Sequence, residues 1–178
     1  MAGDSREFGR ETSSAIKKNM KAVRAISIEQ WLELAKDGTE IPIQITLDGY
    51  SMQPFIRKGQ DIVTILPVNR PLRWGEVVLL RRQDGTYIVH RICCVKDDMV
   101  QTVGDRCVKK DGPVRKCEVY GLVEYRERNG LNIPLNHGGI RFCGMLWLLL
   151  FPLRAPLMRM YAVTSGIFRK ITHKEPAE

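Results

Sequence analysis

Apolar residues recur at every second position in the middle of the chain, and this alternation restricts the possible folds more than any other feature. Between residues 41 and 47 (IPIQITL), isoleucine or leucine occupies each odd position. A period of two places alternate side chains on opposite faces of a strand, whereas an amphipathic helix needs a period of about 3.6. The pattern therefore predicts a β-strand with one buried face.

Six further strands are predicted at short spacing after this one. They cover residues 61–66, 76–81, 87–95, 99–103, 118–126 and 131–135. Two of the intervening turns contain Asp84-Gly85 and Asn129-Gly130, and such dipeptides favour tight hairpins between antiparallel strands. We therefore expect a mainly β protein, built on an antiparallel unit of six or seven strands.

Helices are expected only at the two ends of this β unit. Residues 27–30 (SIEQ) fit a capping box, and a short apolar helical face follows before Asp37-Gly38 ends the helix. With 178 residues, the chain has the length of one folded unit with tails. We expect a flexible tail over 1–25, a β domain over 26–136 and a basic, apolar helical segment over 137–178.

The C-terminal segment has the composition of a membrane-surface helix. Residues 142–153 (FCGMLWLLLFPL) form twelve positions without a charge, which is short of the roughly 20 that span a bilayer. Five basic residues and no acidic one lie between Arg141 and Ile171. We expect these helices to lie on an anionic membrane surface, with packing on the protein's own core as the alternative. The polar first twenty residues predict neither a signal peptide nor an N-terminal transmembrane helix.

The charge balance narrows the choice of partners. Lys and Arg number 28 against 20 Asp and Glu, which gives a net charge of +8. Nucleic acid, an anionic membrane or an acidic partner would each suit a basic chain. Only one convincing helix is predicted in residues 1–40, so no DNA-binding headpiece and no nucleic-acid partner are expected. The five cysteines show no zinc-ligand spacing, and we expect no metal and no cofactor.

Three residue types that nucleophilic catalysis requires follow one another near the ends of predicted strands. Ser51 lies in a turn bounded by glycine and proline, His90 in the strand over 87–95, and Asp105 and Asp111 after the strand over 99–103. Each alone is more often a turn residue or a structural residue. Together they provide a serine, an imidazole base and a carboxylate that could orient it. The spacing leaves open whether these groups meet.

Five landmarks in this order resemble the signal peptidase I and LexA-type serine peptidase superfamily. They are the segments 49–54 (GYSMQP), 59–61 (GQD), 75–76 (GE), 89–91 (VHR) and 104–105 (GD). Bacterial signal peptidases and LexA-type repressors use a Ser-Lys pair. The branch of archaea and of the endoplasmic reticulum uses Ser, His and Asp with a Val-His-Arg signature. The chain is most similar to this second branch, because histidine stands at the position of the base.

The resemblance implies a signal peptidase/LexA-like antiparallel β fold and a role for each landmark. Ser51 would be the nucleophile, His90 the general base, and Asp105 or Asp111 the orienting carboxylate, with no choice between the two. The substrate would be an extended leader or signal segment of a precursor protein. Its groove would be lined by Met52, Pro54 and Phe55, unless these residues are plain packing residues.

One departure concerns the oxyanion. Gly49 stands where many signal peptidases have Ser or Thr, so the oxyanion hole would depend on backbone N–H groups, such as that of Ser51.

Two other functions remain open at this point. The first is a dedicated processing protease that acts on one partner precursor peptide on the cytoplasmic side of a membrane. The second is a LexA-like regulatory module. That module would need a lysine where His90 stands and a DNA-binding headpiece before the β domain. The leading expectation is therefore a peripheral or monotopic membrane-associated serine endopeptidase, with the side of the membrane open.

Overall fold

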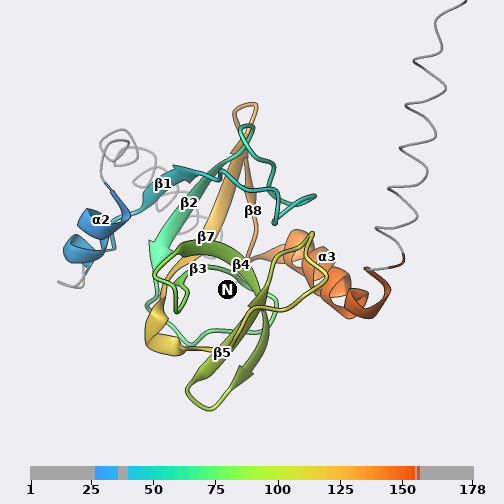
Figure 1. The fold of residues 1–178 in the computed structure, drawn as a ribbon. Helices are drawn as coiled ribbons and strands as arrows, with labels where there is room; N and C mark the ends of the chain where they lie inside the picture. Colours follow the sequence, from blue (N-terminus) through green and yellow to red (C-terminus); the bar gives the residue numbers. More distant parts are fainter. Residues whose placement is uncertain (1–26, 36–39, 155, 157–178) are drawn as a thin grey trace, which may run out of the picture.

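The computed structural model describes residues 27–35, 40–154 and 156, and its centre is one antiparallel sheet of eight strands that curls on itself (Figure 1). The protein is therefore mainly β, as predicted. The strands are β1 (Ile43–Thr46), β2 (Ile62–Pro67), β3 (Val77–Arg81), β4 (Tyr87–Lys96), β5 (Met99–Val103), β6 (Val114–Arg115), β7 (Val119–Arg128) and β8 (Leu131–Pro134). Helix α2 (Ile28–Ala35) precedes the sheet, the 3-10 helix η1 (Lys116–Glu118) follows β6, and α3 (Gly138–Leu149) follows β8.

Strand β7 lies at the centre of the sheet and pairs with three other strands. The strand order is β1-β2-β7-β3-β4-β5-β6, and β8 pairs with β7 off this path. β7 thus pairs with β2, β3 and β8, and every pairing in the sheet is antiparallel. The β3–β4 and β4–β5 pairs are both hairpins. The Asp84-Gly85 dipeptide predicted the turn between β3 and β4.

Each of the seven predicted strands is present, with ends that differ by a few residues at most. The first strand is shorter than expected and begins at Ile43, directly after Pro42, which has no N–H to donate to the ladder. β6 was not predicted, because two residues are too few to show a period of two. The turn at Asn129-Gly130 connects β7 and β8, with a positive φ at both residues as such hairpin turns require.

The core has two parts, one on each face of β3. Val77 and Leu79 belong to a buried cluster that includes Trp31 of α2, whereas Val78 and Leu80 belong to a second cluster with residues of β4 to β7. β3 is therefore buried on both faces, which agrees with its continuous apolar run. The indole N–H of Trp31 donates to the carbonyl of Ile41 over 2.7 Å and fixes α2 against the start of the sheet.

The predicted capping box is present at the start of α2. The backbone N–H of Gln30 donates to Ser27 Oγ at 3.2 Å, and the backbone N–H of Ser27 donates to Gln30 Oε1 at 3.0 Å. The expected tail over 1–25 and the end of α2 at Asp37-Gly38 lie outside the described residues.

Helix α3 is the described part of the apolar C-terminal segment, and it lies beside the sheet (Figure 1). A further helical turn covers residues 151–154. None of the described helices is long and apolar enough to cross a membrane. The rest of the predicted helical segment, from 157 to 178, lies outside the described residues.

A buried carboxylate ties β2 to β7. Asp61 is fully buried, and Arg128 donates to it from Nε at 2.5 Å and from Nη2 at 2.6 Å. The backbone N–H of Arg57 adds a third bond at 2.7 Å. Burial by itself raises the pKa of the Asp61 carboxyl, but the bonds from Arg128 and Arg57 outweigh it, and the pKa lies below its usual value.

Asp61→Asn should therefore lower the free energy of unfolding by about 3 kcal/mol, because it leaves Arg128 without its anionic partner. Since the folded-state pKa is lowered, the contribution of Asp61 is complete above about pH 4 and is lost as the pH falls through the folded-state value. Urea unfolding of the wild type and the variant between neutral and acidic pH would measure both effects. Asp98→Asn, which changes an exposed carboxylate, should have little effect; equal losses in both variants would contradict the role of Asp61.

Candidate active site

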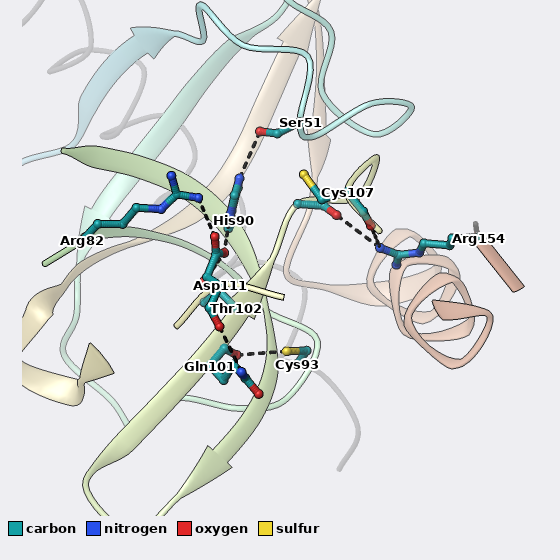
Figure 2. A network of polar contacts seen from close by, with 10 residues as sticks. Ser51, Arg82, His90, Cys93, Gln101, Thr102, Cys107, Asp111 and Arg154 are labelled. Atoms are coloured by element: carbon teal, nitrogen blue, oxygen red, sulfur yellow. Dashed lines mark hydrogen bonds and ion pairs between the residues drawn. The ribbon is translucent and has the colours of Figure 1, made fainter. Parts of the chain in front are cut away.

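Ser51 lies in a tight turn that follows β1. The backbone N–H of Gln53 donates to the carbonyl of Tyr50 at 3.2 Å, and that of Ile56 donates to Met52 at 2.9 Å. These bonds form a compact turn over 50–56, and the serine side chain points from this turn toward the sheet (Figure 2). The predicted placement of Ser51, in a turn after a strand, is thus found.

His90 lies on β4 and is 4% exposed. Its Nε2 is 3.0 Å from Ser51 Oγ, and its Nδ1 is 2.5 Å from Asp111 Oδ2 (Figure 2). An ionised carboxylate can only accept hydrogen bonds, so Nδ1 carries the proton of the neutral imidazole and Nε2 is left to accept the serine proton. The three side chains therefore form one continuous hydrogen-bonded line, although the chain separates them by 39 and 21 residues.

Asp111 is held by three groups besides His90. Thr102 Oγ1 donates to its Oδ2 at 2.8 Å, Arg82 Nη2 donates to its Oδ1 at 2.5 Å, and its backbone N–H donates to the carbonyl of Thr102 at 2.8 Å. Burial alone raises the pKa of the Asp111 carboxyl, but the hydrogen bonds from His90, Thr102 and Arg82 together lower it below its usual value. Asp111 therefore stays ionised at neutral pH and faces the imidazole as an anion.

Asp105, the other predicted candidate, has a different partner. Arg91 donates to its two oxygens from Nε at 2.8 Å and from Nη2 at 2.9 Å, and both residues are 0% exposed. Successive residues of a strand point to opposite faces, so His90 and Arg91 lie on different sides of β4. Asp111 thus bonds His90, and Asp105 bonds the next residue of β4, Arg91. The expectation that Asp105 could orient His90 is not met.

The turn over 104–107 holds the backbone of Ser51. The backbone N–H of Arg106 donates to the carbonyl of Ser51 at 2.7 Å. A Cβ at Gly104 would lie 2.8 Å from that same carbonyl oxygen and 3.0 Å from Ser51 Cβ, so this approach requires glycine. The glycine of the GD landmark is therefore explained by close contact with the serine turn.

Two residues of the C-terminal segment support this turn, and the sequence did not single out either for that role. Arg154 is 1% exposed; its Nη1 donates to the carbonyls of Gly104 at 3.2 Å and Cys107 at 3.4 Å (Figure 2). The indole N–H of Trp147 donates to the carbonyl of Asp105 at 2.6 Å. The one feature of the sequence that could have indicated this role is the position of Arg154 directly after the uncharged run over 142–153. One side of the segment thus packs against the protein itself, through Trp147 and Arg154.

The three residues expected in a substrate groove differ in their surroundings. Met52 is 1% exposed and belongs to the core cluster of Trp31, so its side chain is a packing residue. Pro54 is exposed. Phe55 is half-buried, with the Arg91 guanidinium 4.9 Å from its ring centroid. Met52 is thus corrected to a core residue, and a groove role remains a prediction for Pro54 and Phe55.

The line Ser51–His90–Asp111 has the geometry that acyl transfer needs. Imidazole titrates near neutral pH and can accept the hydroxyl proton, which turns a weak nucleophile into an alkoxide-like one. The anionic carboxylate on the other ring nitrogen fixes the tautomer and stabilises the imidazolium. The side chain of Arg91 cannot act as the base, because a guanidinium stays protonated.

Comparison with known proteins assigns no family to the chain: no family model matches it, and no curated protein matches it. Its chemistry is therefore inferred from the residues themselves.

Gly104→Ala should displace the Ser51 turn, because the added methyl group would overlap the Ser51 carbonyl. A nucleophile displaced by about 1 Å loses on the order of 100-fold in rate, so labelling of Ser51 by a serine-directed fluorophosphonate should slow by about that factor. Gly112→Ala is the matched control, since a Cβ there meets no atom within 4 Å, and its labelling rate should not change. Labelling that is equally fast in both variants would disprove the contact's role.

Proposed function

We propose that the chain is a serine endopeptidase of the signal peptidase type, which hydrolyses one peptide bond in the leader or signal segment of a precursor protein. The observation that carries the proposal is the hydrogen-bonded order Ser51–His90–Asp111, with 3.0 Å and 2.5 Å between successive groups. The second support is the order of the five landmarks, which resembles the Ser-His-Asp branch of the signal peptidase superfamily. Two of these landmarks contact Ser51 directly: His90 through its Nε2 at 3.0 Å, and the 104–107 turn through the backbone N–H of Arg106 at 2.7 Å.

Acylation is the first half of the proposed reaction. Ser51 Oγ attacks the carbonyl carbon of the peptide bond while His90 Nε2 takes the hydroxyl proton. The resulting oxyanion is stabilised by backbone N–H donors, among which we propose that of Ser51 itself. The C–N bond then breaks, the leaving amine takes the proton from His90, and an acyl-serine remains. Asp111 stays ionised throughout and stabilises the imidazolium.

Deacylation repeats the same proton transfers with water as the nucleophile. His90 Nε2 takes a proton from water as its oxygen attacks the acyl carbon, and the proton then passes to Ser51 Oγ as the ester bond breaks. The products are a free carboxyl end and a regenerated serine. In both half-reactions His90 Nε2 must be free to accept a proton from the attacking hydroxyl or water.

The identity of the base separates this proposal from a LexA-like regulatory module. That module, like the bacterial signal peptidases, uses lysine where His90 lies. His90 has both ring nitrogens engaged, one by the serine and one by a carboxylate, which is the arrangement of a general base. The endopeptidase is therefore the function that the site supports best.

Ser51→Ala and His90→Ala should each reduce peptide cleavage by at least about 10³-fold, because neither half of the pair works alone. Purified protein would be incubated with a diverse peptide pool, and products would be identified by mass spectrometry. His137→Ala is the matched control, since His137 is exposed at the start of α3 and bonds Glu124 instead. Cleavage that survives Ser51→Ala would exclude Ser51 as the nucleophile, and cleavage lost equally in His137→Ala would exclude a specific role for His90.

We also propose that α3 places this site on an anionic membrane surface. The support is an exposed apolar stripe, defined by Phe142, Leu146, Leu149 and Leu150 at helical spacing, with Leu153 exposed just beyond. The opposite side of this segment contacts the protein through Trp147, Leu148 and Arg154. The stripe is therefore exposed in the described part of the chain, while the opposite side of the segment supports the turn next to Ser51.

The double substitution Phe142→Ser and Leu149→Ser should weaken membrane binding, because each removes apolar surface that would enter the lipid. Flotation with vesicles of phosphatidylcholine and phosphatidylserine should bring the wild type to the top fraction and leave most of the variant at the bottom. Leu131→Ser, at the exposed start of β8, is the control and should float like the wild type. A wild type that stays at the bottom would overturn the membrane proposal.

A further inference from the structure

A cavity of about 500 Å³ includes Arg82, the partner of Asp111, in its lining, while neither Asp111 nor His90 lines it. It is formed by the β3–β4 hairpin, the start of β5 and the segment of β6 and η1. Its charged lining residues are Arg81, Arg82, Arg115 and Glu118, and its apolar lining includes Met99 and Val114. The mechanism proposed above uses none of this surface except Arg82.

The lining of this cavity has a net positive charge. Arg81 and Arg115 provide two guanidinium groups against the one carboxylate of Glu118, while the charge of Arg82 is paired with Asp111. Glu118 also accepts a hydrogen bond from the Tyr120 hydroxyl at 3.2 Å. A cavity lined mostly by one sign of charge attracts and holds ligands of the opposite sign. Guanidinium groups bind carboxylates through paired hydrogen bonds, so the chemistry of the lining favours an acidic ligand.

The edge of the sheet suggests the shape of that ligand. β6 is the last strand in the sheet order and pairs with β5 through Met99–Arg115 and Val100–Val114. An edge strand presents backbone groups to which an extended chain can add. Because Val114 and Arg115 line the cavity, an extended peptide along β6 would bring its side chains to the arginines and to Met99.

We propose that this basic cavity binds an acidic, extended polypeptide segment, and that in the working enzyme the segment belongs to the substrate. The binding itself stands on the cavity, whereas the second part rests on the proposed endopeptidase function. An acidic stretch outside the cleaved bond would then help to select the precursor. Nucleic acid is the less suitable occupant, because the apolar lining and the strand edge match a peptide.

The cavity is also connected to the catalytic line. Arg82 lines the cavity and donates to Asp111 Oδ1, while Asp111 Oδ2 faces His90 (Figure 2). An acidic side chain bound there would compete with Asp111 for the same guanidinium. For this reason, the test changes Arg115, which lines the cavity at β6, and leaves Arg82 intact.

Binding would be measured by fluorescence anisotropy with the full chain carrying Ser51→Ala, so that no probe is cleaved. The probe is a short labelled peptide of alternating valine and glutamate, compared with the same peptide in which glutamine replaces glutamate. The acidic peptide should bind, and Arg115→Gln should weaken its affinity by about tenfold. Arg73→Gln is the matched control, because it removes one exposed positive charge that does not line the cavity, and it should leave the affinity unchanged.

Three results would overturn the proposal: no binding of the acidic peptide, equal weakening by Arg115→Gln and Arg73→Gln, or displacement of the peptide by a single-stranded RNA of equal charge at lower concentration. Failure of the proposed function looks different. In that case the acidic peptide still binds in an Arg115-dependent way, but the protein with Ser51 intact cleaves no peptide. Conversely, cleavage of peptides without any acidic preference would retain the endopeptidase and reject the cavity as its substrate site.

Discussion

The buried ion pair between Arg91 and Asp105 is the interaction on which the rest of the structure around the serine depends. Arg91 donates to both oxygens of Asp105 and also, from Nη1, to the carbonyl of Gly75 at 2.9 Å. A Cβ at Gly144 of α3 would lie 2.4 Å from the same Nη1, so the helix approaches the guanidinium closely only because that position is glycine. One side chain of β4 thus connects β4, the 104–107 turn, the loop before β3 and α3.

This pair also explains how His90 is positioned. A charge buried without its partner costs several kcal/mol, so Arg91 and Asp105 must face each other in the folded protein. Because neighbouring residues of a strand point in opposite directions, fixing Arg91 on one face fixes His90 on the other. The 104–107 turn that carries Asp105 in turn holds the Ser51 backbone through Arg106. The alternation of side chains along β4 therefore places the Arg91–Asp105 pair on one face and the Ser51–His90–Asp111 hydrogen bonds on the other.

The other acidic landmarks have the same structural role. Asp61 is bonded by Arg128, and Glu76 is bonded by Arg70 at 2.7 Å and by the backbone N–H of Arg73 at 2.8 Å. In each case a buried carboxylate next to a strand is neutralised by arginine, and its loop is thereby tied to the sheet. Asp111 differs because imidazole is one of its partners. Among the described residues, Asp111 is the carboxylate that bonds His90.

Sequence by itself determined the β class, the seven longer strands and the capping box of α2, because periodicity and capping are local properties that a few adjacent residues set. It also singled out Ser51, His90 and the two aspartates. The choice between Asp105 and Asp111 needed the tertiary structure, since it depends on which face of β4 each loop returns to. The same holds for the burial of Met52, the contacts of Arg154 and the basic cavity beside β6. Each of these features is formed by segments that lie far apart in the chain. A local sequence pattern does not indicate which distant segments come into contact.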